Sequence, residues 1–176
     1  MAIDTFSMSK LYIMRHGQAQ PGERGIKDED RPLTSEGEDK VRKMVALAQQ
    51  LGAKIDLIVS SPYRRAIHTA EIAKEILKPK SAKIIVDKSL EPERTPYEVY
   101  AFLAKERRRL RSVDMKTTLI ISHKPCVEDL ISDLLGSAGM NLAFPPASLS
   151  RIDVAESVAP STRTGTLKWL VSSDSI

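Results

Sequence analysis

Short apolar runs of strand length alternate with longer segments of helical periodicity, and this alternation restricts the fold more than any other feature of the sequence. The apolar runs that we interpret as buried strands are residues 11–14, 55–59, 83–86 and 118–121. The segments with helical periodicity are residues 35–51, 62–77, 95–110 and 125–135. Repeated strand–helix units are typical of a mostly parallel sheet with helices on both faces, so we expect an α/β fold, a three-layer α/β/α sandwich.

Local signals predict where the helices begin and end. The expected starts are Ser35 with Glu38 as a capping box, Ser61 as an N-cap with Pro62 in the first turn, and Thr95 with Pro96 and Glu98. The residues on one face of the first helix are Val41, Met44, Val45, Ala48 and Leu51, with Gly52 at its end. We therefore expect this face to pack on the sheet.

The remaining segments complete one domain. Residues 148–154 and 166–171 are predicted to form a final pair of strands, which adds an antiparallel edge to the sheet. Residues 18–31 and 139–146 contain Gly and Pro, and we interpret both as loops. A chain of 176 residues without internal repeats fits a single domain across its whole length, with residues 1–9 flexible.

Composition excludes several classes of protein. No apolar run approaches the roughly 20 residues that a membrane-spanning helix needs, and residues 1–10 have no apolar stretch of the signal-peptide type. The one cysteine, Cys126, allows no disulfide within the chain, and we interpret it as a buried structural residue rather than a catalytic thiol. We therefore expect a cytoplasmic protein that makes no membrane contact.

The charge balance favours an anionic partner. The net charge is +4, a modest excess that suits an anionic substrate. The densest basic run, residues 105–111, is interpreted as a solvated helix face, with docking of an acidic or phosphorylated partner as the alternative. No aromatic residues interleave with these charges, so we expect no nucleic-acid binding.

Residues suited to phosphate chemistry follow three of the predicted strands. Arg15, His16 and Gly17 follow the first strand, Arg65 lies in the turn after the second, and His123 follows the fourth. Ligands of open parallel sheets bind beyond the carboxyl ends of the strands, so we expect these residues to meet. A neutral imidazole is a competent nucleophile near pH 7, arginine binds phosphate oxygens in pairs, and glycine lets the backbone pass close to the phosphate. The pattern therefore predicts phosphoryl transfer through a phosphohistidine intermediate.

Some of these residues also have a purely structural interpretation. Arg65 is equally compatible with covering the sheet edge or pairing with Glu71, and His68, one turn further along, is interpreted as a packing residue or as support for the site. A metal site formed by the three histidines lacks a carboxylate or Cys at a matching spacing. We therefore expect neither a metal nor another cofactor.

Four motifs occur in order over roughly residues 11–135. They are Leu11–Gly17, Arg31–Thr34 followed by Gly37, Ser61–Ala66 with Thr69, and Ser122–Pro125 with Val127. Together they resemble the histidine phosphatase, or phosphoglycerate-mutase-like, superfamily, and within it the short SixA-type phosphohistidine phosphatases. The resemblance implies that His16 becomes phosphorylated, and the residues that it implies for the phosphate pocket are Arg15, Arg65 and His123. It also implies that Arg31 faces the phosphate and that Gln18 contacts phosphate or substrate.

Many members of this superfamily use a carboxylate as general acid, for which the chain offers Glu91, with Glu93 as the alternate. SixA-type enzymes are thought to need little or no such acid. The nitrogen of a phosphoramidate leaves readily once it is protonated, whereas an alkoxide leaving group needs the proton more. The short chain also lacks room for the large cap insertions of sugar-phosphate members. We therefore expect an open pocket that admits a protein side chain.

These observations favour a metal-independent phosphatase that dephosphorylates phosphohistidine on proteins. The main alternative is a small-molecule phosphatase that acts on sugar or nucleotide phosphate monoesters. A phosphoglycerate mutase is less favoured because it needs a reliably placed acid, and a non-catalytic phosphate-binding module is less favoured because it has no need of a nucleophile. Residues 141–147 either border the pocket or form a plain connecting loop, and we prefer the second interpretation.

Overall fold

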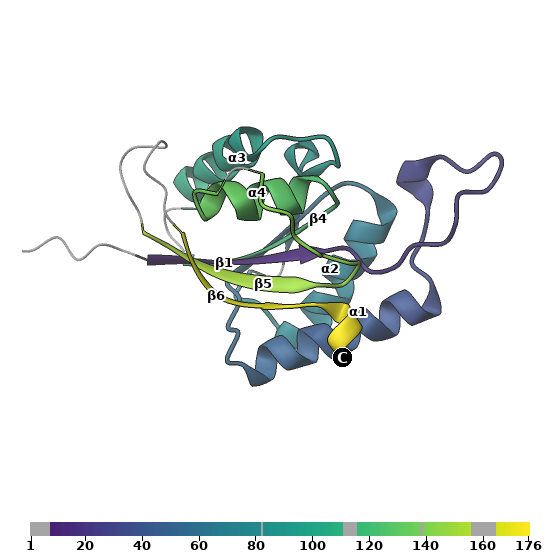
Figure 1. Cartoon of the computed structure of the whole chain (residues 1–176), viewed down its shortest axis with the longest axis horizontal. Helices are drawn as coiled ribbons and strands as arrows, with labels where there is room; N and C mark the ends of the chain where they lie inside the picture. Colours follow the sequence, from purple (N-terminus) through teal and green to yellow (C-terminus); the bar gives the residue numbers. More distant parts are fainter. Residues whose placement is uncertain (1–7, 82, 111–115, 138, 156–164) are drawn as a thin grey trace, which may run out of the picture.

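A six-stranded sheet with helices on both faces is the central feature of the computed structural model, which describes residues 8–81, 83–110, 116–137, 139–155 and 165–176 (Figure 1). The strands are β1 (Met8–Arg15), β2 (Leu57–Ser60), β3 (Ile84–Val86), β4 (Thr117–Ser122), β5 (Leu149–Ala155) and β6 (Gly165–Val171). The α-helices are α1 (Ser35–Gln50), α2 (Arg64–Leu77), α3 (Pro96–Arg109) and α4 (Cys126–Leu134). The short 3-10 helices are η1 (Asp28–Asp30), η2 (Lys88–Leu90) and η4 (Ser173–Ser175).

The strand order is β3-β2-β4-β1-β5-β6. The first four strands in this order pair in parallel, whereas β5 runs antiparallel to β1, and β6 runs antiparallel to β5. This arrangement confirms the predicted α/β fold with a mostly parallel sheet. The predicted antiparallel addition consists of two strands, of which β6 forms the edge.

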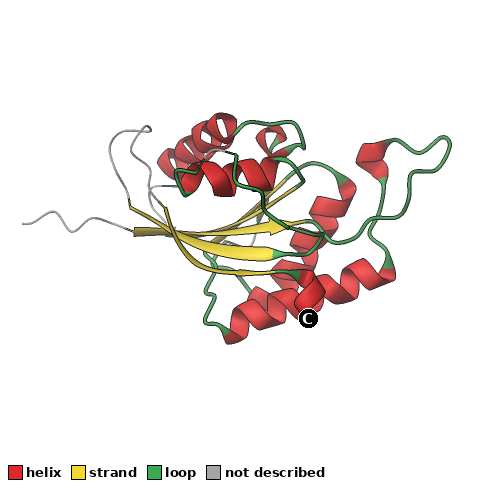
Figure 2. Ribbon diagram, in the orientation of Figure 1, coloured by secondary structure: helices red, strands yellow, loops and turns green. Residues whose placement is uncertain are grey.

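Side chains alternate between two cores, one on each face of the sheet. Tyr12 and Met14 belong to the core that α1 and α2 cover, whereas Ile13 belongs to the core under α3 and α4. Figure 2 shows these two helical layers on either side of the strands. β2 and β4 are buried along their whole length, and strands that are buried on both faces need continuous apolar runs, which explains why these two could be predicted from the sequence.

The predicted N-cap of the first helix is wrong, whereas its predicted end at Gly52 is confirmed, because Leu51 is the C-cap and Gly52 follows it with a φ of 82°. Thr34, rather than Ser35, is the N-cap of α1, and its hydroxyl accepts a hydrogen bond from the Gly37 amide at 3.0 Å. The helix ends at Gln50, and Leu51 is 47% exposed instead of facing the core. The helix therefore begins where a hydroxyl reaches a free amide of the first turn, and it ends before its last apolar residue.

The other two predicted starts have opposite outcomes. The N-cap of α2 is Tyr63, so Ser61 does not cap this helix, and its hydroxyl lies instead 2.7 Å from a ring nitrogen of His123. By contrast, α3 begins at Thr95 and Pro96 as predicted, and reciprocal hydrogen bonds between Thr95 and Glu98 form a capping box there.

Predictions for the chain start and the basic run are met only in part. Residues 1–7 lie outside the described residues, and the prediction that residues 1–9 are flexible is wrong for Met8 and Ser9, which pair with β5. Most of the basic run is exposed on α3, but Glu106 within it is buried and accepts a hydrogen bond from Arg109 at 2.8 Å.

Cys126 is buried, as expected. No helix within the described ranges is long and apolar enough to cross a membrane.

Candidate active site

Two adjacent parallel strands and the helix after a third bring the predicted site residues together. Arg15 pairs with Ser122 at the carboxyl ends of β1 and β4, and the residues that follow, His16 and His123, have ring centroids 4.8 Å apart. Arg65, in the first turn of α2, donates from Nε to Nε2 of His16 at 3.2 Å. All three side chains are buried.

The main-chain carbonyl next to His16 determines which nitrogen of its ring carries the proton. Nδ1 of His16 lies 2.6 Å from the carbonyl oxygen of Gly17. Because a carbonyl oxygen only accepts hydrogen bonds, Nδ1 is the protonated nitrogen, and Nε2 presents its lone pair to Arg65. Burial lowers the pKa of His16 to about 3 against the opposing effect of the Gly17 hydrogen bond, and the charges of Arg65, Arg15 and Arg31 lower it further. The ring is therefore neutral with a nucleophilic nitrogen.

His123 is even more enclosed, at 2% exposure. Its Nε2 lies 2.7 Å from the Ser61 hydroxyl, and the Tyr63 ring packs edge-on at 4.9 Å. Its Nδ1 is buried and has no hydrogen-bond partner among the described residues. Burial lowers the pKa of His123 to about 2, and His16 and nearby arginine charges add to this effect. In the tautomer in which the Ser61 hydroxyl donates to Nε2, Nδ1 carries the proton and would donate to a ligand oxygen.

The loop before β5 holds Arg15. Nη1 of Arg15 donates to the Phe144 carbonyl at 3.0 Å. The Ala147 amide lies within hydrogen-bond distance of the main-chain carbonyls of Arg15 and His16. Residues 141–147 therefore border the site, and their preferred interpretation as a plain connecting loop is wrong. The Nε of Arg15 is buried and has no hydrogen-bond partner in the described parts of the chain, so it is a second polar atom available to an anion.

A carboxylate near Arg15 was missed in the sequence. Burial lowers the pKa of Arg15, and the negative charge of Glu128 opposes this shift. The Glu128 side chain is only 13% exposed and lies 3.3 Å from Lys124 in an ion pair. The signal for its position was its place in the first turn of α4, immediately after the segment that carries His123.

Asp28 connects the two remaining arginines. Its Oδ2 accepts from Nη2 of Arg65 at 2.9 Å, and its Oδ1 accepts from Nη1 of Arg31 at 2.7 Å. Arg65 therefore pairs with Asp28 and not with Glu71. Partial burial alone would raise the pKa of Asp28, but the hydrogen bonds from Arg65 and Arg31 hold it below its ordinary value. Arg31 also donates to the Gln20 carbonyl, at 2.7 Å, which fixes it beside the site.

Gly17 has a packing role in addition to the predicted one. A Cβ at this position would lie 2.7 Å from a methyl of Val41 and 2.8 Å from the Gly37 carbonyl. The absent side chain therefore makes room for α1, and the close approach of phosphate to this residue stays a prediction. The Gly17 amide donates to Thr69 Oγ1 at 3.1 Å, and that hydroxyl donates to the Arg65 carbonyl at 2.7 Å.

Other candidates lie at the margin of this cluster. Gln18 has an exposed side chain, and its carbonyl accepts from the Thr34 amide at 2.9 Å. Glu91 forms an ion pair with Arg94 at 2.9 Å, and Glu93 is exposed. His68 is partly exposed and lies 3.9 Å from Glu38, so it packs at the surface, not against the two rings. The described contacts therefore join none of Gln18, Glu91 or Glu93 to the two rings.

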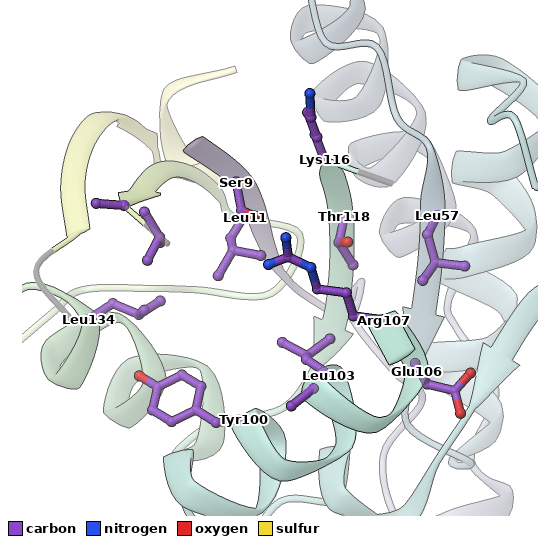
Figure 3. A pocket seen from close by; sticks show the side chains of 13 residues that line it. Ser9, Leu11, Leu57, Tyr100, Leu103, Glu106, Arg107, Lys116, Thr118 and Leu134 are labelled. Carbon is purple, nitrogen blue, oxygen red and sulfur yellow. The ribbon is translucent and has the colours of Figure 1, made fainter. Parts of the chain in front are cut away.

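Two cavities differ in their relation to the cluster. A groove of about 800 Å³ adjoins it, with Tyr63, Glu91 and His68 in its walls. The cavity of about 200 Å³ shown in Figure 3 lies at the amino ends of β1 and β4, where Ser9 and Lys116 line it. It is therefore at the opposite end of the sheet. Across the described ranges, no three His, Cys, Asp or Glu side chains are grouped so that they could hold a metal ion.

Comparisons with known proteins find similar phosphatases. A family model of the histidine phosphatase superfamily (branch 1) matches residues 11–92. The phosphohistidine phosphatase SixA of Escherichia coli (strain K12) is 28% identical over 164 residues, which cover 93% of each chain. A solved structure of the protein histidine phosphatase SixA complexed with tungstate matches with a TM-score of 0.77 at 26% identity, over 94% of this chain and 98% of that one.

More distant structures share the fold. A mycobacterial glucosyl-3-phosphoglycerate phosphatase matches with a TM-score of 0.70 at 14% identity, over 93% of this chain and 99% of that one. The fold thus accommodates different phosphatases, and the family model with the SixA relatives is the more informative match. The chain thus matches the histidine phosphatase superfamily model over residues 11–92 and is similar to SixA-type phosphohistidine phosphatases over most of its length, and these matches support a phosphatase.

Proposed function

We propose that this protein is a metal-independent phosphatase that removes phosphate from phosphohistidine on proteins through a phosphorylated His16. The observation that carries the proposal is the state of the His16 ring. Its Nδ1–H is held by the Gly17 carbonyl and its Nε2 lone pair faces Arg65, 3.2 Å away. An imidazole in this state can attack phosphorus without first losing a proton.

The reaction has two displacement steps. In the first, Nε2 of His16 forms a bond to phosphorus while the bond from phosphorus to the substrate imidazole breaks, and that imidazole takes up a proton from solvent. In the second, water forms the new phosphorus–oxygen bond and loses a proton, the bond to His16 breaks, and inorganic phosphate leaves. The Nε2 lone pair is then restored for the next cycle.

The buried polar atoms around His16 are suited to the charge that develops on the transferred group. We propose that Arg15 Nε and Arg65 donate to phosphoryl oxygens, with Arg31 adding positive charge from further out. The ring of His123 lies beside that of His16, and its unpartnered Nδ1 offers a further contact. Fixed donors in a buried site stabilise such charge more than donors in water do.

The surroundings of Glu91 support a phosphoramidate substrate. Its carboxylate is engaged in an ion pair with Arg94 at 2.9 Å, and no described contact joins it to the two rings. A substrate imidazole needs a strong acid less than an alkoxide does. The groove of about 800 Å³ next to Tyr63 also leaves space for a protein substrate to approach.

We propose, in addition, one catalytic domain across the chain and a cytoplasmic location, the latter because of its single cysteine.

The direct test compares a phosphohistidine peptide with a panel of sugar and nucleotide phosphates. We expect phosphate release from the peptide, undiminished by EDTA. The His16→Ala variant should lose at least about 10³-fold in rate, as expected when a covalent nucleophile is removed. Labelled substrate should leave acid-labile phosphate on His16. Turnover of the sugar phosphates alone would refute the substrate assignment, and loss of activity in EDTA would refute the metal-free mechanism.

A further inference from the structure

Asp28 contacts the arginine that touches His16 with both its main chain and its side chain. Its carbonyl oxygen accepts from Nη1 of Arg65 at 2.6 Å, and its Oδ2 accepts from Nη2 at 2.9 Å. Its second carboxylate oxygen accepts from Nη1 of Arg31 at 2.7 Å. One residue of η1, separated from Arg65 by 37 positions in the chain, therefore orders two guanidinium groups.

The planar guanidinium gives these contacts a direction. Nη1 and Nη2 form its outer edge, while Nε and Nη2 form the edge beside it. Asp28 occupies the outer edge of Arg65, and Nε on the other edge points at Nε2 of His16, 3.2 Å away. The edge that remains for a ligand is thus the one that faces the attacking nitrogen.

We propose that Asp28 is a positioning residue, which holds the outer edge of Arg65 so that the inner edge stays aimed at the phosphoryl group on His16. The proposal rests on the proposed function and adds one residue to it. Without Asp28, the guanidinium could turn about its terminal torsions. A displacement of about 1 Å in a group that contacts the reacting centre costs about 10²-fold in rate.

The geometry argues against a different role for Asp28, that of an internal anion which occupies the place of the phosphate. Such an anion would cover the edge of Arg65 that faces His16. The Asp28 side chain lies instead at the other edge, where it is 57% exposed while the Arg65 side chain is 7% exposed. The two roles predict opposite changes in KM and kcat, so they can be separated.

Three variants test the proposal with the phosphohistidine peptide as substrate. In Asp28→Ala we expect kcat to fall at least about tenfold with KM within about threefold, because the contact acts mainly in the transition state. Asp28→Asn should lose less, since its amide oxygen still accepts one hydrogen bond. Asp30→Ala removes an exposed carboxylate from the same 3-10 helix and should match wild type. An unchanged kcat with a lower KM in Asp28→Ala would overturn the proposal, as would an equal loss in Asp30→Ala.

Crystal structures of Asp28→Ala and Asp30→Ala provide a measurement that does not depend on turnover. We expect Arg65 Nε to leave Nε2 of His16 in the first variant and to stay in the second, with both variants melting near the wild-type temperature. An Arg65 that does not move in Asp28→Ala would overturn the proposal. An inactive wild-type protein would instead refute the proposed function, and the position of Arg65 would still decide the role of Asp28.

Discussion

At the residue scale, the two histidines of the site are neutral because they are buried, even though hydrogen-bonding groups surround them. Desolvation lowers the pKa of His16 to about 3 and that of His123 to about 2. The neighbouring guanidinium groups act in the same direction, since they repel a second positive charge. The arginines that would bind phosphate thus also help to keep the attacking nitrogen free of a proton.

This neutrality predicts a pH dependence of stability. Between pH 7 and pH 5 the unfolded chain binds protons on both rings, whose ordinary pKa is about 6.5, whereas the folded protein does not. The free energy of unfolding therefore falls as the pH falls. Because His16→Asn removes one of the two rings, its loss of stability over this range should be smaller than that of wild type by about 2 kcal/mol. Urea unfolding of both proteins at pH 7 and pH 5 measures this difference, and equal losses would contradict it.

At the scale of the elements, the segment after β1 packs tightly against the start of α1. A Cβ at Gly17 would lie 2.7 Å from Val41, and a Cβ at Gly37 would lie 2.2 Å from the Gln18 carbonyl. Two glycines, one on each side of the contact, therefore let the strand end and the helix approach each other. The position of His16 depends on this contact, because it directly precedes Gly17.

Substitution of Gly17 by alanine should therefore affect both stability and rate. We expect Gly17→Ala to lose about 1–3 kcal/mol of unfolding free energy, as in other overpacked interiors, and to lower kcat by displacing His16. Gly22→Ala is the matched control, because a Cβ there meets no atom within 4 Å. Urea unfolding and turnover of the two variants provide the comparison. Equal unfolding free energies for the two variants would contradict this prediction, because they would show that α1 can shift to accommodate the added methyl group without loss of stability.

The elements also show which parts of the site could be predicted from sequence. The meeting of His16 and His123 follows from a general rule, because parallel strands end at the same edge of a sheet. The contact of Asp28 with Arg65 follows no such rule, since it depends on how a Gly- and Pro-containing loop folds back. The start of α2 was misplaced because Ser61 fits an N-cap in sequence, while its hydroxyl lies against a ring nitrogen of His123.

At the scale of the whole molecule, one end of the sheet carries the candidate site and the other end carries a structural carboxylate. The candidate site occupies the carboxyl ends of β1 and β4, and a buried carboxylate, Asp56, organises the opposite end. Its Oδ2 accepts from the amides of Lys116 and Thr117 at 3.1 and 2.9 Å, and its Oδ1 lies 2.7 Å from Lys80 Nζ. Asp56 thus connects the beginning of β4 to the segment that precedes β2.

We expect Asp56→Ala to separate stability from catalysis. The substitution leaves two main-chain amides without their acceptor, which costs about 1–3 kcal/mol for each group that stays buried and unpaired. Because the residue lies at the far end of the sheet, kcat at a temperature where the variant is folded should stay within about twofold of wild type. Thermal unfolding and peptide turnover measure the two effects, and a large fall in kcat would show that the two ends are coupled.

The hydroxyl of Thr69 has a consequence for how the site can move. It accepts from the amide after His16 and donates to the carbonyl of Arg65, and it has only one proton to give. The nucleophile and the guanidinium that faces it are thereby fastened to a single turn of α2. A tilt of this helix would therefore strain the hydrogen bond between Gly17 and Thr69, because the His16 amide is also held to the Ser122 carbonyl of β4 at 3.0 Å.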